Sequence, residues 1–118
     1  MSHQIADLKS NPTYIKVQKN LQRIAVEEIV YLKSNDDHVQ IIFKDNSVIQ
    51  PRITLKKLLE QLPQDLFVQI HRSYAAAIQH IETISSDEIN ITGKKLPIGR
   101  MYKAHLKQTL KKLSLQIS

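Results

Sequence analysis

The fold depends on one stretch, Phe67 to Ala77, which reads FVQIHRSYAAA. Its first five residues alternate between apolar and polar side chains, the pattern of a strand with one buried face. A run of side chains that can hydrogen-bond or carry charge follows, from His71 to Tyr74, and three alanines come next. Such a cluster is unfavourable in a buried strand. It suits a strand that ends at a surface that binds a ligand. The stretch therefore predicts a strand that presents Arg72 to a ligand.

Short strands and tight turns surround this stretch on both sides. Alternating apolar and polar side chains, separated by runs of Ser, Asn, Asp and Gly, predict antiparallel strands joined by turns. The expected strands, about nine in all, include residues 13–18, 21–26, 29–33, 38–43, 48–50, 67–71, 88–92 and 95–98, with a single helical turn at 26–29. Strands this short favour small antiparallel sheets that pack together.

Two segments predict helices. Thr54 is a suitable N-cap for a helix that runs through Leu62, and its leucines at i, i+3, i+4 and i+7 form an apolar stripe for the core. A second helix is expected from Arg100 onward, with leucines on one face and lysines on another. No two adjacent helical patterns are joined by a short turn, which excludes the usual helix-turn-helix domain. The expected fold class is mainly β, with one internal helix and a C-terminal helix.

The composition indicates one globular domain with a basic surface. The 118 residues carry 17 Lys and Arg against 11 Asp and Glu, a formal charge of +6. The segment from Arg100 to Ser118 holds five basic residues and no acidic one. A basic surface attracts polyanions, chiefly nucleic acid or an anionic membrane, and charge alone does not choose between them.

Several other classes of protein are disfavoured. The chain has no cysteine, which excludes a disulfide framework and thiolate metal sites and suits a reducing cytoplasm. It has no signal-peptide pattern and no apolar run long enough to span a membrane. The five histidines lack a paired metal-ligand spacing, and the two glycines form no phosphate-binding loop. We therefore expect a cytoplasmic protein that is not an enzyme and that holds no metal or cofactor.

Three side chains are candidate contacts for an anionic ligand. His38 follows a polar turn, Arg72 follows a strand, and Arg100 opens the basic helix. A guanidinium fork suits phosphate or the O6/N7 edge of guanine, and a helix start favours anions. Ordinary structural roles remain open for each of the three: a surface histidine stabilised by Asp36 and Asp37, an arginine paired with Asp65 or Glu82, and a solvated arginine in a first helical turn.

Taken together, these motifs resemble the LytTR family of bacterial DNA-binding domains. The resemblance covers roughly Ile15 to Leu110. It is carried by EEIVYLKSNDDHVQIIFKDN at 27–46, TLKKLLEQLP at 54–63, FVQIHRSY at 67–74, HIETI at 80–84 and LPIGRMY at 96–102. The segment IHRSY is the most specific part of it.

The resemblance implies an elongated stack of small antiparallel β-sheets that binds double-stranded DNA through loops. It implies base contacts in successive major grooves from His38, Arg72 and Arg100. It implies phosphate contacts from Ser73 and Lys103, with Gln50 and Arg52 as weaker candidates. It also implies a transcriptional regulator that binds direct repeats and bends them, with two copies of the chain paired on the DNA.

Two positions depart from the family pattern. Ala77 stands where family members usually carry Asn, and Gly99 where they usually carry Ser. Family members are also mostly fused behind a phosphorylatable receiver domain, for which this chain has no room, so we expect a stand-alone regulator or an excised effector domain. The domain is expected to cover residues 13–118, behind a polar tail at 1–12. The rival hypothesis is a basic interaction module that docks on an anionic membrane or an acidic protein partner.

Overall fold

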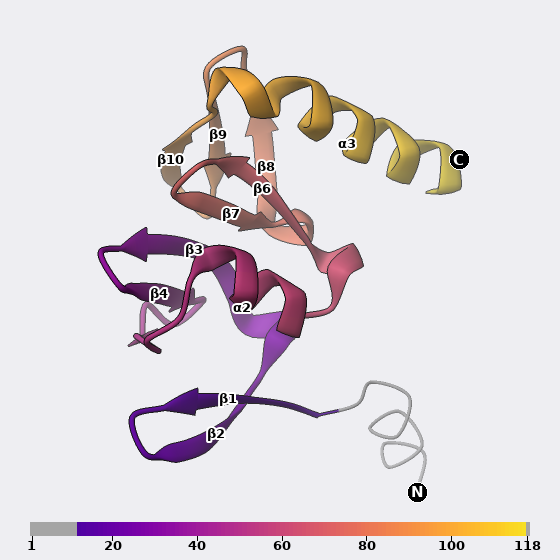
Figure 1. Cartoon of the computed structure of the whole chain (residues 1–118). Helices are drawn as coiled ribbons and strands as arrows, with labels where there is room; N and C mark the ends of the chain where they lie inside the picture. The colour runs from indigo at the N-terminus through magenta and orange to yellow at the C-terminus, as the bar shows by residue number, and fades with distance from the viewer. Residues whose placement is uncertain (1–11, 118) are drawn as a thin grey trace, which may run out of the picture.

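Small antiparallel sheets make up most of the protein. The structure, a computed structural model, describes the backbone of residues 12–117 and the side chains of residues 12–113. Within that range ten strands form three sheets, and Figure 1 shows the sheets stacked one above another with the last helix across the top. The predicted fold class is confirmed. The expected tail at 1–12 lies outside the described residues except for Pro12, and the domain boundary stays a prediction.

The three sheets follow one another along the chain. The first is the hairpin of β1 (Thr13–Val17) and β2 (Asn20–Ile24). The second, in the order β5-β4-β3-β7-β6, contains β3 (Ile29–Asn35), β4 (His38–Phe43), β5 (Val48–Ile49), β6 (Phe67–His71) and β7 (Tyr74–Ala77). The third, in the order β10-β9-β8, contains β8 (Ile81–Ile84), β9 (Glu88–Ile91) and β10 (Lys94–Pro97).

Two α-helices are described, each close to its predicted position. Helix α2 (Leu55–Gln61) begins at Thr54, whose hydroxyl oxygen accepts the backbone N–H of Lys57 (3.2 Å), as predicted. Helix α3 (Lys103–Ile117) follows the 3-10 turn η4. The first residues of the predicted C-terminal helix therefore form a 3-10 turn and not an α-helix. The 3-10 turns are η1 (Val26–Glu28), η2 (Gln64–Leu66), η3 (Ile78–His80) and η4 (Arg100–Tyr102).

The five-stranded sheet separates two hydrophobic cores. One core lies between this sheet, α2 and the β1–β2 hairpin, and Leu58 of α2 is fully buried within it. The other lies between the opposite face of the sheet, the three-stranded sheet and α3, whose Leu106 is 1% exposed. A sheet with both faces covered holds its turns on a rigid base, which suits a binding edge made of loops.

The three alanines of the opening stretch form a central strand, which the sequence analysis missed. Strand β7 lies between β3 and β6, and all three alanines are at most 2% exposed. Ala75 and Ala77 face the first core, and Ala76 faces the second. A strand buried on both faces shows no alternation, and alanine has weak strand propensity, so neither signal was present. Strand β8 was also missed; these two strands and the eight expected ranges make up the ten described strands.

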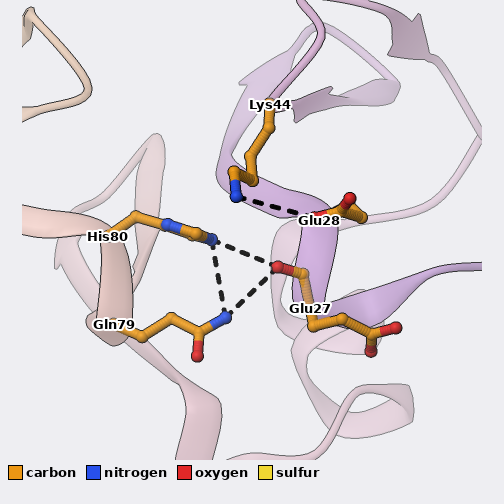
Figure 2. Close-up of polar contacts among 5 residues, drawn as sticks. All are labelled: Glu27, Glu28, Lys44, Gln79 and His80. Carbon is orange, nitrogen blue, oxygen red and sulfur yellow. Dashed lines mark hydrogen bonds and ion pairs between the residues drawn. The ribbon is translucent and has the colours of Figure 1, made fainter.

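A polar link joins the two larger sheets at the end of β3 away from the β3–β4 turn. Gln79 of η3 donates its side-chain N–H to the carbonyl oxygen of Glu27 in η1 (3.2 Å), and Nε2 of His80 lies 3.2 Å from the same oxygen (Figure 2). Next to it, the N–H of Lys44 donates to the carbonyl of Glu28 (2.9 Å). The two contacts with the Glu27 carbonyl fix the entries to β3 and β8 relative to each other.

Candidate nucleic-acid interface

Backbone hydrogen bonds gather three segments at one edge of the molecule. The N–H of Ser34, just before the β3–β4 turn, donates to the carbonyl of Ser73 in the β6–β7 turn (2.8 Å). The N–H of Gly99 donates to the carbonyl of Ile70 at the end of β6 (2.8 Å), which brings the entry to η4 beside that same turn. In Figure 1 both strand turns point to the left of the view, with the start of the last helix above them. These segments carry His38, Arg72 and Arg100 respectively.

His38 opens β4 and is held by the turn before it. Its Nδ1 lies 2.6 Å from Oδ1 of Asp37, and Nε of Arg52 lies 3.1 Å from Oδ2 of the same carboxylate. The hydrogen bond from His38 is the main cause that holds the pKa of Asp37 below its usual value, and the positive charge of Arg52 acts in the same direction. Asp37 thus stabilises His38, as one alternative predicted, while 41% of the His38 side chain remains exposed.

Arg72 and Ser73 form the two-residue turn between β6 and β7, and the Arg72 side chain is exposed. Among the ion pairs found within residues 12–117, none involves Arg72. The alternative of a pair with Asp65 or Glu82 is therefore not realised among these residues, and Glu82 instead accepts the backbone N–H of Gly93 (3.2 Å). The guanidinium fork of Arg72 stands at the tip of a turn with its donors open to solvent.

Three neighbours fix the shape of this turn. Nδ1 of His71 accepts the backbone N–H of Ser73 (3.1 Å), and its ring meets the ring of Tyr74 edge to face at 5.6 Å. The side-chain amide of Gln69 donates to the carbonyls of His71 (3.1 Å) and Arg72 (3.5 Å). His71 and Tyr74 thus support the turn from the two adjoining strands. Gln69 was missed, although it is the one polar residue between Phe67 and Ile70.

Arg100 is the exposed first residue of η4, and Gly99 before it packs closely against β6. A Cβ at position 99 would lie 3.0 Å from the Tyr102 ring and 3.5 Å from the Cα of His71. The φ angle of Gly99 is −69°, so glycine is not needed there for backbone conformation. A side chain at position 99 would therefore be tight only against the Tyr102 ring. The bond from Gly99 to Ile70 holds the entry to η4 beside the end of β6, which leads into the turn of Arg72.

The four predicted phosphate contacts differ in how they are engaged. Lys103, at the start of α3, has its ammonium 3.1 Å from Oδ1 of Asp87. Ser73 is half-buried, and Gln50 is exposed. Arg52 is tied to the His38 turn through Asp37, and the carbonyl of Pro51 accepts the N–H of Val39 (3.1 Å). The loop after β5 therefore lies beside the start of β4, which the order of elements alone did not predict.

Two further cations, which pair with aromatic rings of the central sheet, were not identified from the sequence. Nζ of Lys33 lies 5.9 Å from the centroid of the Tyr74 ring, and Nζ of Lys94 lies 5.7 Å from that of Tyr31. The interaction with the Tyr31 side chain raises the pKa of Lys94, so this ammonium stays charged. Both lysines are exposed strand residues. Their pairing with aromatic rings depends on cross-strand register, which spacing in the sequence does not reveal.

Two other kinds of site are absent from the described part of the chain. Residues 12–117 bring together no group of three His, Asp or Glu side chains that could hold a metal ion. No helix in that range is long and apolar enough to cross a membrane.

Comparison with known proteins points to one family. Residues 19–111 match the family model of the LytTr DNA-binding domain. The sensory transduction protein LytT of Enterococcus faecalis is 30% identical over 108 residues, which cover 86% of this chain and 44% of that protein. LytT of Bacillus subtilis is 26% identical over 102 residues, which cover 81% of this chain and 42% of that protein.

A solved structure agrees with the sequence matches. The LytTr DNA-binding domain of a methyl-accepting/DNA response regulator from Bacillus cereus superposes with a TM-score of 0.71 at 19% identity, covering 84% of this chain and 95% of that one. At 19% identity, this structural similarity establishes the fold alone. The chain spans less than half of the length of the curated relatives it matches. Because the family model covers most of the chain, the chain belongs to the LytTr DNA-binding domain family.

Proposed function

We propose that this domain binds double-stranded DNA in a sequence-specific way and serves as a transcriptional regulator. Its family is one of DNA-binding domains and not of enzymes, so the function is binding without catalysis. In the proposal, His38, Arg72 and Arg100 contact base edges in successive major grooves. The DNA site is a pair of direct repeats on which two copies of the chain lie side by side.

The observation that supports the proposal most is the shared edge of the three turns. The bonds from Ser34 to Ser73 and from Gly99 to Ile70 tie these turns to the central sheet. Arg72 and Arg100 are exposed there. Arginine at a rigid turn suits a bidentate contact with the O6 and N7 atoms of guanine in the major groove. A fold with this edge needs no recognition helix.

Phosphate contacts supply much of the affinity in this account. Ser73 and Lys103, with Gln50 and Arg52 in a lesser role, flank the three base-contacting residues. The formal charge of +6 favours any DNA, because cations release counterions from the phosphate backbone. Binding therefore weakens steeply as salt rises, for specific and non-specific DNA alike.

Selection of bound sequences from a random duplex pool tests the proposal. We expect an enriched site with two copies of one short motif in the same orientation, spaced by about one helical turn of DNA. A gel-shift titration at matched salt then compares the enriched duplex with a scrambled one. Flotation with anionic liposomes at that salt tests the rival function. Binding to liposomes together with equal affinity for both duplexes would overturn the proposal in favour of a basic interaction module.

A further inference from the structure

We infer that Asp37 determines which base His38 recognises, because it fixes the tautomer of the His38 ring. The inference deepens the proposed function and rests on it. Asp37 is a positioning residue in this account, since it acts on DNA through His38. Its carboxylate uses both oxygens: Oδ1 bonds Nδ1 of His38 at 2.6 Å, and Oδ2 lies 3.1 Å from Nε of Arg52.

The contact between Asp37 and His38 decides which ring nitrogen carries the proton. An ionised carboxylate has no proton to donate, so Nδ1 of His38 must be the donor across 2.6 Å. Asp37 is ionised at neutral pH, as an ordinary aspartate is, and the hydrogen bond from His38 lowers its pKa further. When the ring carries a single hydrogen, this leaves Nε2 with a lone pair as an acceptor, whereas a ring with hydrogen on both nitrogens would donate from Nε2.

An acceptor at Nε2 selects one chemical class of base edge. In the major groove, adenine offers an N6 amino group and cytosine an N4 amino group, and both are donors. Guanine offers O6 and N7 acceptors, which need a donor from the protein. The position contacted by His38 is therefore an adenine or a cytosine. The opposite tautomer, with hydrogen on Nε2, would instead donate to O6 or N7 of guanine, N7 of adenine or O4 of thymine.

The negative charge of Asp37 is unfavourable at an edge that is proposed to face polyanionic DNA. A carboxylate there repels phosphate unless nearby cations offset it. Arg52 supplies that offset from the loop after β5, which the Val39 N–H to Pro51 carbonyl bond (3.1 Å) holds beside the turn. The arrangement keeps one carboxylate as the fixed acceptor for His38 while its charge is compensated by Arg52.

Neighbouring Asp36 provides a matched control for charge. It lies in the same turn, carries the same charge, is exposed, and has a φ of 61° that asparagine tolerates well. Among the hydrogen bonds found within the described residues, no side-chain contact links Asp36 to His38. Asp36→Asn and Asp37→Asn thus remove the same charge, but only the second acts on a residue that bonds the ring.

The test is duplex selection with the folded full chain and five variants: His38→Ala, Asp37→Ala, Asp37→Asn, Asp36→Asn and Arg52→Ala. His38→Ala identifies the base position that His38 contacts, since preference there disappears. At that position we expect the unmodified chain to favour adenine or cytosine by roughly 3- to 10-fold, the range for one net hydrogen bond. Asp37→Ala removes this preference or shifts it toward guanine. Asp37→Asn retains part of it, because its amide oxygen still accepts from Nδ1.

Two control variants separate the effect of Asp37 on base preference from the effects of lost negative charge and of the Arg52 contact on affinity. We expect Asp36→Asn and Arg52→Ala to change affinity for all duplexes by a common factor while the preference at the His38 position stays. A guanine preference in the unmodified chain, or an unchanged preference in Asp37→Ala, overturns the role of Asp37 alone. If His38→Ala changes no base preference, then His38 does not contact a base, and the role inferred for Asp37 is also wrong.

Discussion

The backbone N–H of Ser73 donates a hydrogen bond to Nδ1 of His71 across 3.1 Å, and this bond closes the turn that displays Arg72. Nδ1 of His71 is therefore an acceptor, whereas Nδ1 of His38 donates to Asp37. The Nδ1 atoms of two histidines at one edge thus have opposite hydrogen-bonding roles, each set by its neighbour. The first shapes a turn, and the second prepares a nitrogen for contact with a base.

His71→Ala tests the bond to Ser73. The change leaves the Ser73 N–H without its acceptor in a half-buried turn, and we expect the free energy of unfolding to fall by about 1 kcal/mol. His71→Asn is the matched variant, because its side-chain oxygen can occupy the place of Nδ1 and accept the same N–H. Equilibrium urea unfolding measures both. Equal losses for the two variants would show that ring packing on Tyr74, and not the hydrogen bond, is what His71 contributes.

Leu58→Ala tests the core under the five-stranded sheet. Leu58 is fully buried, and removing three of its carbon atoms leaves a cavity, so we expect a loss of about 3 kcal/mol in the free energy of unfolding. The neighbouring Leu59 is only half-buried, and Leu59→Ala should cost about 1 kcal/mol. Thermal and urea unfolding provide the comparison. A larger loss at Leu59 would mean that α2 presents a different face to the sheet.

Asp87→Asn tests whether Lys103 contacts phosphate. In the free protein the Lys103 ammonium is 3.1 Å from the Asp87 carboxylate, which is 83% exposed. Removing that negative charge releases Lys103, so we expect tighter binding to specific and scrambled duplexes by one common factor of about 2 to 5, the scale of an exposed ion pair. Fluorescence anisotropy at two salt concentrations measures it. Unchanged or weaker binding would remove Lys103 from the phosphate contacts.

Gly99→Ser introduces the serine that members of the LytTR family usually carry at this position. Gly99→Ala is its control. Both add a Cβ at 3.0 Å from the half-buried Tyr102 ring, which must shift by a few tenths of an ångström. Only serine adds a hydroxyl at the N-cap of η4, so we expect the serine variant to be more stable than the alanine variant by about 1 kcal/mol. Calorimetric unfolding of both variants gives this difference. Equal stability would show that the hydroxyl makes no cap bond.

Local signals in the sequence predicted the elements whose causes are local. The cap at Thr54, the apolar stripe of α2 and the helical turn at Val26–Glu28 each depend on neighbours within a few residues, and each is confirmed. The same holds for most hairpin strands, whose alternation reflects one buried face. Strand β7 was missed because its burial on both faces comes from β3, β6 and the two cores.

The candidate site was predictable as a set of residues but not as an arrangement. Its residue types and family resemblance singled out His38, Arg72 and Arg100. The contacts of Asp37 with Arg52 and of Asp87 with Lys103 join residues that are distant in sequence, and no spacing rule predicts them. The support from Gln69 also depends on how the β6–β7 turn folds back.

The central claim is that Arg72 contributes specificity, and one comparison tests it most directly. The affinities of the unmodified chain, Arg72→Ala and Arg72→Lys are measured for the selected duplex and for a scrambled duplex at the same salt. The account predicts that Arg72→Ala loses about 1–3 kcal/mol on the selected duplex and clearly less on the scrambled one, and that lysine, which lacks the planar fork, restores little of the difference. An equal loss on both duplexes would contradict the claim, because Arg72 would then contact only phosphate.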